Sequence, residues 1–129
     1  MSFGMAITAA AGPLSNLVLA VLATLALGGV VWYLPAGAAQ PALLGLLQIM
    51  IGLNVNLALF NLIPVPPLDG SRILDHFVPT RLRPAWERVT LLAPFLLFGV
   101  VIFGGRIISG PSGFVVGLLT QLLVVLRPA

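Results

Sequence analysis

Long runs of apolar residues, separated by short clusters of proline, glycine and polar residues, dominate the chain. The first run extends over residues 7–34 and is densest from Leu17 onward, and the second extends over residues 43–63. Neither run contains a charged side chain. Each is long enough to cross the roughly 30 Å hydrocarbon core of a bilayer as an α-helix. The pattern therefore predicts two transmembrane helices in the first half of the chain.

Two further apolar runs, over residues 90–108 and 114–126, fill the second half. The last has only 13 residues, which is short for a crossing, so a tilted or re-entrant partial helix is expected there. The predicted fold is all-α: a polytopic membrane protein with three to four transmembrane helices, one of them broken by prolines. Residues 1–129 are expected to form a single membrane domain.

Proline and glycine mark the predicted connections between these runs. Pro35-Ala36-Gly37 and Pro41 bound a short first loop, and residues 64–89 form a long polar loop. The sequence Gly110-Pro111-Ser112-Gly113 predicts a tight turn between the third and fourth runs.

The composition agrees with a membrane protein. Hydrophobic residues make up 60% of the chain and charged residues only 7%, whereas a soluble domain averages about 25% charged residues. The six basic residues, all arginines, outnumber three acids and give a net charge of +3. They form no basic stripe, which argues against nucleic acid as a partner. The expected partners are the lipid bilayer and either a transmembrane protein substrate or partner helices.

The distribution of arginines predicts the orientation in the membrane. Four of them lie in the long polar loop: Arg72, Arg81, Arg83 and Arg88. Because basic loops stay in the cytoplasm, this loop is expected to be cytoplasmic in an integral protein of the cell (inner) membrane. Four crossings would then place both termini in the cytoplasm, in agreement with Arg127. Arg106 does not fit this scheme and is expected to snorkel to the outer interface.

Four asparagines interrupt the apolar runs: Asn16 in the first, and Asn54, Asn56 and Asn61 in the second. A buried amide is costly unless it is hydrogen-bonded. Asn54 and Asn56 therefore allow two interpretations, hydrogen bonding between neighbouring helices or a functional role inside the membrane.

The first charged side chain of the sequence, Asp69, ends the stretch "FNLIPVPPLDG" together with Gly70. The three prolines before it remove backbone donors and prevent a regular helix. Irregular backbone at membrane depth is tolerated only inside protein or beside a water-filled cavity. Asp69 is thus expected either to face such a cavity or, in a surface loop, to cap a helix that begins near Ser71.

The extended stretch "FNLIPVPPLDGSRIL" resembles the second metal-binding motif of the site-2 proteases, the zinc-dependent intramembrane metalloproteases. The matching positions are Asn61, Pro64, Leu68, Asp69 and Gly70. The stretch "AAAGPLSNL", residues 9–17, resembles the Ala-Gly-Pro-x-x-Asn opening of the preceding span in that family. The resemblance covers residues 9–79. It implies that Asp69 is the third protein ligand of a catalytic zinc and that Asn61 has a supporting catalytic role in placing the substrate.

The chain departs from this family in one respect. The H-E-x-x-H helix that should supply two zinc ligands and the general base is absent, and the chain has a single histidine, His76, and a single glutamate, Glu87. A site built from Asp69 and His76 alone is disfavoured. His76 is expected at the membrane interface, and Asp75 and Glu87 are expected to pair with arginines. The chain alone is therefore expected to be inactive and to bind zinc only weakly.

Two explanations of this gap remain open, that the chain is the C-terminal part of a longer protease or that it is a true short protein. The alternative function is a non-catalytic membrane module that binds partner membrane proteins through its asparagines and through Gly113 and Gly117, a weak GxxxG pattern. A transporter or channel is disfavoured because the sequence contains no internal repeat.

Overall fold

The computed structural model describes residues 3–63 and 68–128. These residues form five α-helices and one 3-10 turn: α1 (Phe3–Tyr33), α2 (Ala39–Asn61), α3 (Asp69–Phe77), η1 (Thr80–Leu82), α4 (Arg83–Leu91) and α5 (Ala93–Leu126). No strand occurs in these two segments, so the all-α prediction is confirmed. The proline-rich residues 64–67, to which the predicted break belongs, lie outside the described part of the chain.

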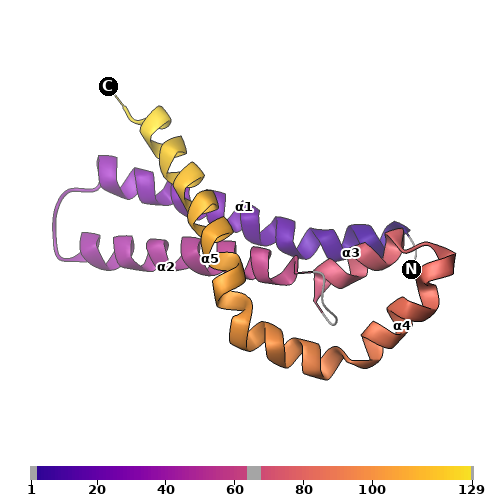
Figure 1. Ribbon diagram of the computed structural model, residues 1–129. Coiled ribbons are helices and arrows are strands. Elements are labelled where there is room, and N and C mark those ends of the chain that lie inside the picture. The colour runs from indigo at the N-terminus through magenta and orange to yellow at the C-terminus, as the bar shows by residue number, and fades with distance from the viewer. Residues whose placement is uncertain (1–2, 64–67, 129) are drawn as a thin grey trace.

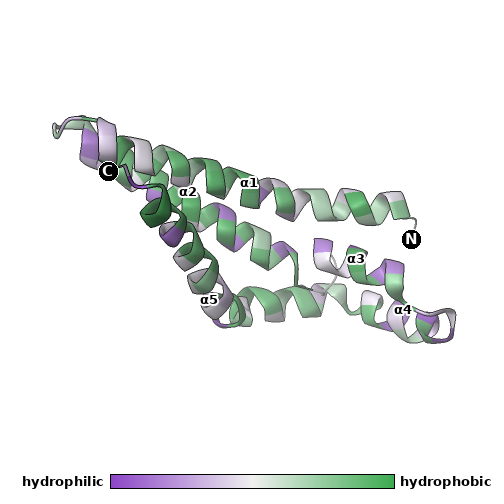
Figure 2. Cartoon of the chain, turned by 90° about the horizontal axis from the view of Figure 1, so that it is seen from above, coloured by the Kyte–Doolittle hydropathy of each residue, from purple (hydrophilic) through white to green (hydrophobic). Residues whose placement is uncertain are grey.

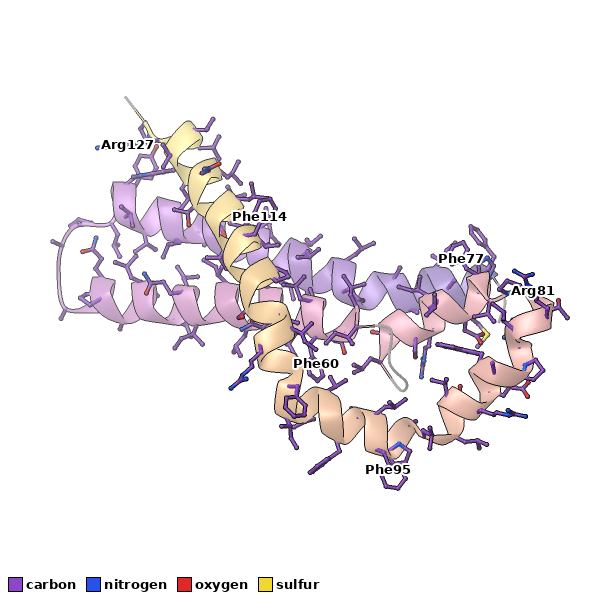
Figure 3. All side chains as sticks on the ribbon, viewed as in Figure 1. Phe60, Phe77, Arg81, Phe95, Phe114 and Arg127 are labelled. Atoms are coloured by element: carbon purple, nitrogen blue, oxygen red, sulfur yellow. The ribbon has the colours of Figure 1, made fainter. Side chains whose placement is uncertain are left out.

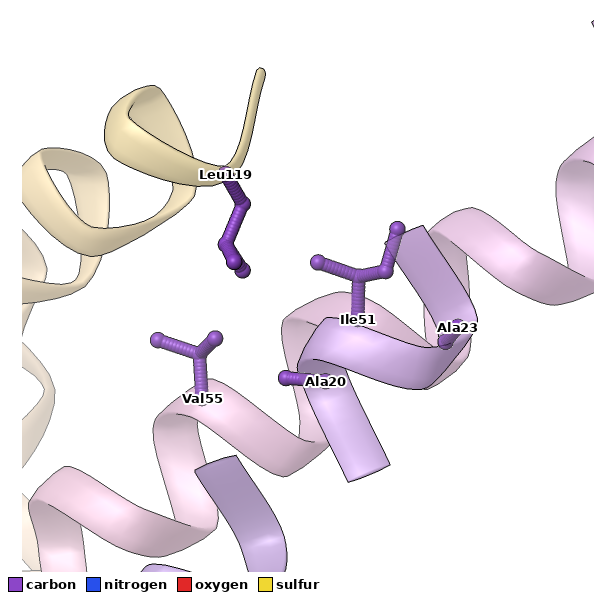
Figure 4. Close-up of a cluster of buried hydrophobic side chains, with 5 residues drawn as sticks. All are labelled: Ala20, Ala23, Ile51, Val55 and Leu119. Atoms are coloured by element: carbon purple, nitrogen blue, oxygen red, sulfur yellow. The ribbon is translucent and has the colours of Figure 1, made fainter. Parts of the chain in front are cut away.

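Helices α1 and α2 form an antiparallel hairpin, and α5 crosses over it (Figure 1). The buried core lies at this crossing and consists of Ala20, Ala23, Ile51, Val55 and Leu119 (Figure 4). The alanines of α1 let the backbones approach closely, which favours association of helices in lipid because hydrophobic burial drives little there. The hairpin is therefore held mainly by close packing of small side chains.

Three helices, α1, α2 and α5, are long and apolar enough to cross a membrane. Figure 2 shows hydrophobic residues along most of their length, whereas polar residues gather on α3 and α4. Large apolar side chains point outward, among them Phe95, which is 77% exposed, and Val125, which is 81% exposed. Such surfaces are suited to lipid rather than to water.

Helix α5 differs from the sequence-based prediction. The expected tight turn at residues 110–113 is absent, and a single helix of 34 residues contains Pro111 in its interior. The helix bends between Phe95 and Phe114 instead of ending (Figure 3). A proline inside a helix removes one hydrogen bond and commonly kinks the helix, and membrane helices tolerate such interruptions. The predicted turn was therefore wrong.

The two ends of the described chain lie at opposite ends of the α1–α2 hairpin (Figure 1). Arg127 lines a cavity together with Gly28 and Trp32, near the end of α1, whereas Arg81 lies at the other end, near the start of α1 (Figure 3). If the hairpin crosses the membrane, a continuous α5 leaves the two termini on opposite faces. The expectation that both termini are cytoplasmic depended on a turn that α5 does not make, and it stays a prediction.

The predicted polar loop contains regular structure. Helix α3 packs along the first part of α1, and η1 and α4 lead from it to α5. The guanidinium of Arg83 joins α4 to α3, with its Nη1 2.8 Å from Oδ1 of Asp75. The segment of α3, η1 and α4 leads into α5 and carries Asp69 at its start.

Candidate metal-ligand site

Asp69 is the first residue of α3, and Leu68 before it is extended and forms the N-cap position. Leu68, and not Asp69, occupies the N-cap position, and it has no capping side chain, so the structure does not support the surface-cap interpretation. A carboxylate in the first turn of a helix is favoured by the partial positive charge of that end. The half-buried side chain has no hydrogen bond or ion pair with the described residues, which leaves its oxygens available to a ligand.

The Asp69 carboxylate lies against Gly12 of α1. A Cβ atom at Gly12 would be 2.9 Å from Oδ2 of Asp69, so any side chain there would displace the carboxylate. The next residue, Pro13, is fully buried and has no N–H to donate to the Ala9 carbonyl one turn earlier. The Gly-Pro pair thus leaves space for the Asp69 carboxylate beside α1 and removes one backbone donor from the same turn.

Gly70 fixes the first turn of α3 against the end of α2. A Cβ atom at Gly70 would overlap the carbonyl groups of Leu62 and Ile63, closer than any real side chain could come. The hydroxyl of Ser71 is buried and donates to the Leu68 carbonyl over 2.7 Å. The structure therefore brings the end of α2, where Asn61 is the last helical residue, into contact with the helix turn that begins at Asp69.

Asn61 itself is half-buried, and its amide has no hydrogen bond with the described residues. The sequence-predicted pair Asn61 and Asp69 is thus gathered at one junction of three helices, although no contact between the two side chains is recorded.

His76 does not join Asp69. Its ring lies between those of Phe3 and Phe77, with ring centroids 5.7 and 5.1 Å away. Asp69 and His76 are about two turns apart on α3, or about 10 Å along its axis, whereas zinc ligands bind at about 2 Å. Within residues 3–63 and 68–128, no group of three His, Cys, Asp or Glu side chains could hold a metal ion.

The other two acids lie away from this junction. Asp75 forms the expected ion pair with Arg83. Glu87 is exposed one turn further along α4, and no ion pair of Glu87 is found in the described segments. The pairing prediction is confirmed for Asp75 alone.

The asparagines within α2 serve its structure. The Asn54 amide donates to the Met50 carbonyl of its own helix over 2.8 Å. The Ser112 hydroxyl on α5 donates to Oδ1 of Asn56 over 2.6 Å. Asn56 therefore bonds a neighbouring helix, as the packing interpretation expected. A Cβ atom at Gly113 or Gly117 would meet nothing within 4 Å, so the described chain does not use its GxxxG pattern.

Sequence reasoning missed the roles of Gly12 and Ser71. Gly12 was noted only as part of a motif, and its contact with Asp69 joins parts of the chain that are distant in sequence. The available signal was a Gly-Pro pair inside an apolar run, which is an unusual choice for a helix interior unless another group approaches closely. Ser71 carried the weaker signal of a hydroxyl directly after an Asp-Gly pair.

Among the described residues, this junction offers one side chain that could bind a catalytic metal, Asp69, and it lacks the further ligands that such a metal needs. Asp69 offers a carboxylate oxygen, a donor that zinc accepts, in a half-buried place without a competing partner in the described part of the chain. A catalytic zinc needs three protein ligands. The described residues therefore do not form a complete zinc site by themselves.

Comparison with known proteins gives a consistent family. The sequence pattern of Peptidase family M50 matches residues 25–103, more than half of the chain. YwhC of Bacillus subtilis (strain 168), whose name assigns it provisionally to the zinc metalloproteases, is 43% identical over 75 residues, which are 57% of this chain and 34% of that protein. SPs1691 of Streptococcus pyogenes serotype M3, named in the same provisional way, is 49% identical over 41 residues, or 32% of this chain and 10% of that protein.

The chain thus spans about a third of the length of YwhC and a tenth of that of SPs1691. No solved structure matches it significantly. The helices that suit a membrane, the Asp69 junction and the match over residues 25–103 agree with one another. The chain belongs to peptidase family M50, the site-2 proteases.

Proposed function

We propose that this chain is the part of a zinc-dependent intramembrane protease that contributes Asp69 as a metal ligand. The substrates would be peptide bonds in transmembrane segments of other proteins. The observation that carries this proposal is the Asp69 carboxylate, which is half-buried, unpaired within the described segments and set against Gly12 at the start of α3. A packing module has no need of a carboxylate held in this way.

Each residue of the junction has a defined task in this proposal. Asp69 holds one coordination position, and the contact of Gly70 with the end of α2 keeps the carboxylate from swinging away. Asn61 donates its amide protons to the carbonyl oxygen of the substrate and so orients the peptide. Zinc, when bound, polarises that carbonyl and lowers the pKa of its water ligand. The two other ligands and the general base are supplied by parts of the protein beyond this chain.

The same proposal sets the place of the chain in the cell. The helices and the family make it an integral membrane protein, and we propose the cell membrane as its location, with α3, η1 and α4 in the cytoplasm because their arginines favour that side. The N-terminus then lies in the cytoplasm too. A cytoplasmic C-terminus would require α5 to turn back within the membrane, and the continuous α5 favours the opposite face.

Exchange of Asp69 for asparagine in the complete protein tests the proposal. Asp69→Asn should abolish cleavage of a transmembrane substrate and lower the zinc content per protein, because an amide is a much weaker ligand than a carboxylate. Asp75→Asn is the matched control. It removes another carboxylate of α3, one that is already paired with Arg83. It should leave both quantities unchanged.

Retention of zinc and of cleavage by the Asp69→Asn protein would refute the ligand assignment. If cleavage is absent even from the unmodified protein, while partner proteins still co-purify with it, the alternative of a non-catalytic helix-packing module would replace the protease. The intact mass of the endogenous protein separates these cases further. A mass well above the 13.5 kDa of this chain, with an H-E-x-x-H segment in the added sequence, is expected.

A further inference from the structure

A groove runs between α1 and α5 at the end of the hairpin farthest from Asp69, and its deeper part also reaches Ile51 and Gly52 of α2. It consists of two adjoining cavities of about 630 Å³ and 410 Å³, both of which Thr120 and Leu123 line. Trp32, Val124 and Arg127 line the mouth. Thr24, Leu27 and Val116 line the deeper part. Nothing in the proposed protease site accounts for this groove.

The groove has a cationic mouth and an apolar body. Arg127 is exposed at the mouth, and no acidic residue lines either cavity. The hydroxyls of Thr24 and Thr120 donate to carbonyls of their own helices, over 2.8 and 2.9 Å. Their methyl groups can therefore serve as apolar wall. Gln48 of α2 is the one amide at the edge of the deeper part.

The length of the groove matches one leaflet of a bilayer. Arg127 directly follows the last residue of α5 and lies about three turns beyond Val116, or about 16 Å along the helix axis, and half of the hydrocarbon core is about 15 Å. Tryptophan next to Arg127 is typical of the level of lipid head groups. We propose that the α1–α5 groove binds an anionic phospholipid, with one acyl chain along the groove and the phosphate beside Arg127.

A second copy of this chain is a poorer occupant of the groove. Helices α1, α2 and α5 contain no acidic residue, so the membrane face of another copy offers nothing to pair with Arg127. A lipid phosphate supplies that charge at the right level, and an arginine guanidinium binds a phosphate through charge-assisted hydrogen bonds.

Native mass spectrometry of the complete protein in detergent tests this binding, with phosphatidylglycerol and phosphatidylcholine as probes. Phosphatidylglycerol should bind in preference. Arg127→Gln should weaken its binding about fivefold, the equivalent of roughly 1 kcal/mol for one basic residue near the membrane surface. Arg106→Gln is the matched control because Arg106 is an exposed arginine of α5 that does not line the groove.

A second pair of variants tests the apolar part. Thr120→Phe fills the place where the two cavities meet and should lower the binding of both lipids, whereas Leu118→Phe, at a 50% exposed position outside the groove, should not. Equal effects of Arg127→Gln and Arg106→Gln, or lipid binding unaffected by Thr120→Phe, would overturn the proposal. So would full competition by soluble glycerol 3-phosphate, which would indicate a site for free anions, or a disulfide-linked dimer of the Thr120→Cys protein, which would indicate a second copy.

Discussion

At the scale of single residues, the junction around Asp69 depends on two glycines with different neighbours. Gly12 faces the end of a flexible side chain, the Asp69 carboxylate, whereas Gly70 faces rigid backbone, the carbonyls of Leu62 and Ile63. A methyl group at the first position can be accommodated if the carboxylate moves. At the second position it can be accommodated only if two helices separate. Substitution by alanine should therefore leave the stability of the protein intact at Gly12 and lower it at Gly70.

Gly12→Ala should impair activity without lowering stability. The added methyl group displaces the Asp69 carboxylate, and a displacement of about 1 Å at a catalytic site can cost on the order of 10²-fold in rate. Alanine in a helix is itself about 1 kcal/mol more favourable than glycine. Substrate cleavage, zinc content and the thermal midpoint of the complete protein would be measured. Gly29→Ala, where a Cβ meets nothing within 4 Å, is the control. Equal activity of both variants would contradict the assigned geometry.

Gly70→Ala should destabilise the protein. The new methyl group meets backbone atoms at the end of α2, and overpacking of this kind typically costs about 1–3 kcal/mol. The thermal midpoint in detergent should fall relative to that of the unmodified protein. Gly105→Ala, an open position on α5, should not lower it. A Gly70→Ala protein as stable as the Gly105→Ala protein would show that the junction is looser than described.

At the scale of elements, the long helices could be predicted from the sequence because an uninterrupted apolar run permits little else in lipid. The runs at residues 7–34 and 43–63 agree with α1 and α2 within a few residues at each end. For the second half of the chain, the sequence predicted a turn between two runs, whereas the structure has one continuous helix. Gly110 and Pro111 end helices in water, but in α5 they lie within a helix, since the bilayer offers no alternative partner to the backbone.

The candidate site was predictable only in part. The motif located Asp69 and Asn61, but no local pattern could reveal that α3 continues beyond α2 alongside the first part of α1 and brings Asp69 to Gly12 (Figure 1). That contact arises from the packing of elements that are distant in sequence. The absence of an H-E-x-x-H segment was, in contrast, readable directly, and the described segments contain no substitute for it.

The hydrogen bond between Asn56 of α2 and Ser112 of α5 should contribute modestly to holding these helices together. A double-mutant cycle with Asn56→Ala and Ser112→Ala should give a coupling free energy of about 0.6 kcal/mol and at most about 1.7 kcal/mol, the range measured between membrane helices. Unfolding in mixed micelles would supply the four free energies. A coupling indistinguishable from zero would mean that this hydrogen bond does not help to hold α2 and α5 together.

At the scale of the whole molecule, two ends of a membrane hairpin carry two different chemistries. One end, where Arg81 lies, carries α3 with the proposed metal ligand Asp69, and the other end, where Arg127 lies, carries the proposed lipid groove (Figure 3). If α1, α2 and α5 each cross the membrane, the Asp69 end and the Arg127 end of the hairpin lie on opposite sides of the bilayer. Whether α5 crosses the membrane completely therefore determines whether Arg127 lies on the cytoplasmic side or on the opposite side.

Labelling of single cysteines should establish that orientation, because the chain contains no cysteine of its own. A membrane-impermeant maleimide should label Thr80→Cys only from the cytoplasmic side and Pro128→Cys only from the opposite side. Both positions are exposed. If both cysteines react from the same side, α5 turns back within the membrane and both termini are cytoplasmic.

The contact of Gly70 with the carbonyls of Leu62 and Ile63, directly after α2, links the position of Asp69 to that of α2. Helix α2 has 23 residues and is thus about 34 Å long, slightly more than the roughly 30 Å of hydrocarbon that it must cross, and a helix absorbs such mismatch by tilting. Since the first turn of α3 rests directly on the end of α2, a change in that tilt carries the Asp69 carboxylate with it. The position of the Asp69 carboxylate should therefore depend in part on the thickness of the surrounding membrane.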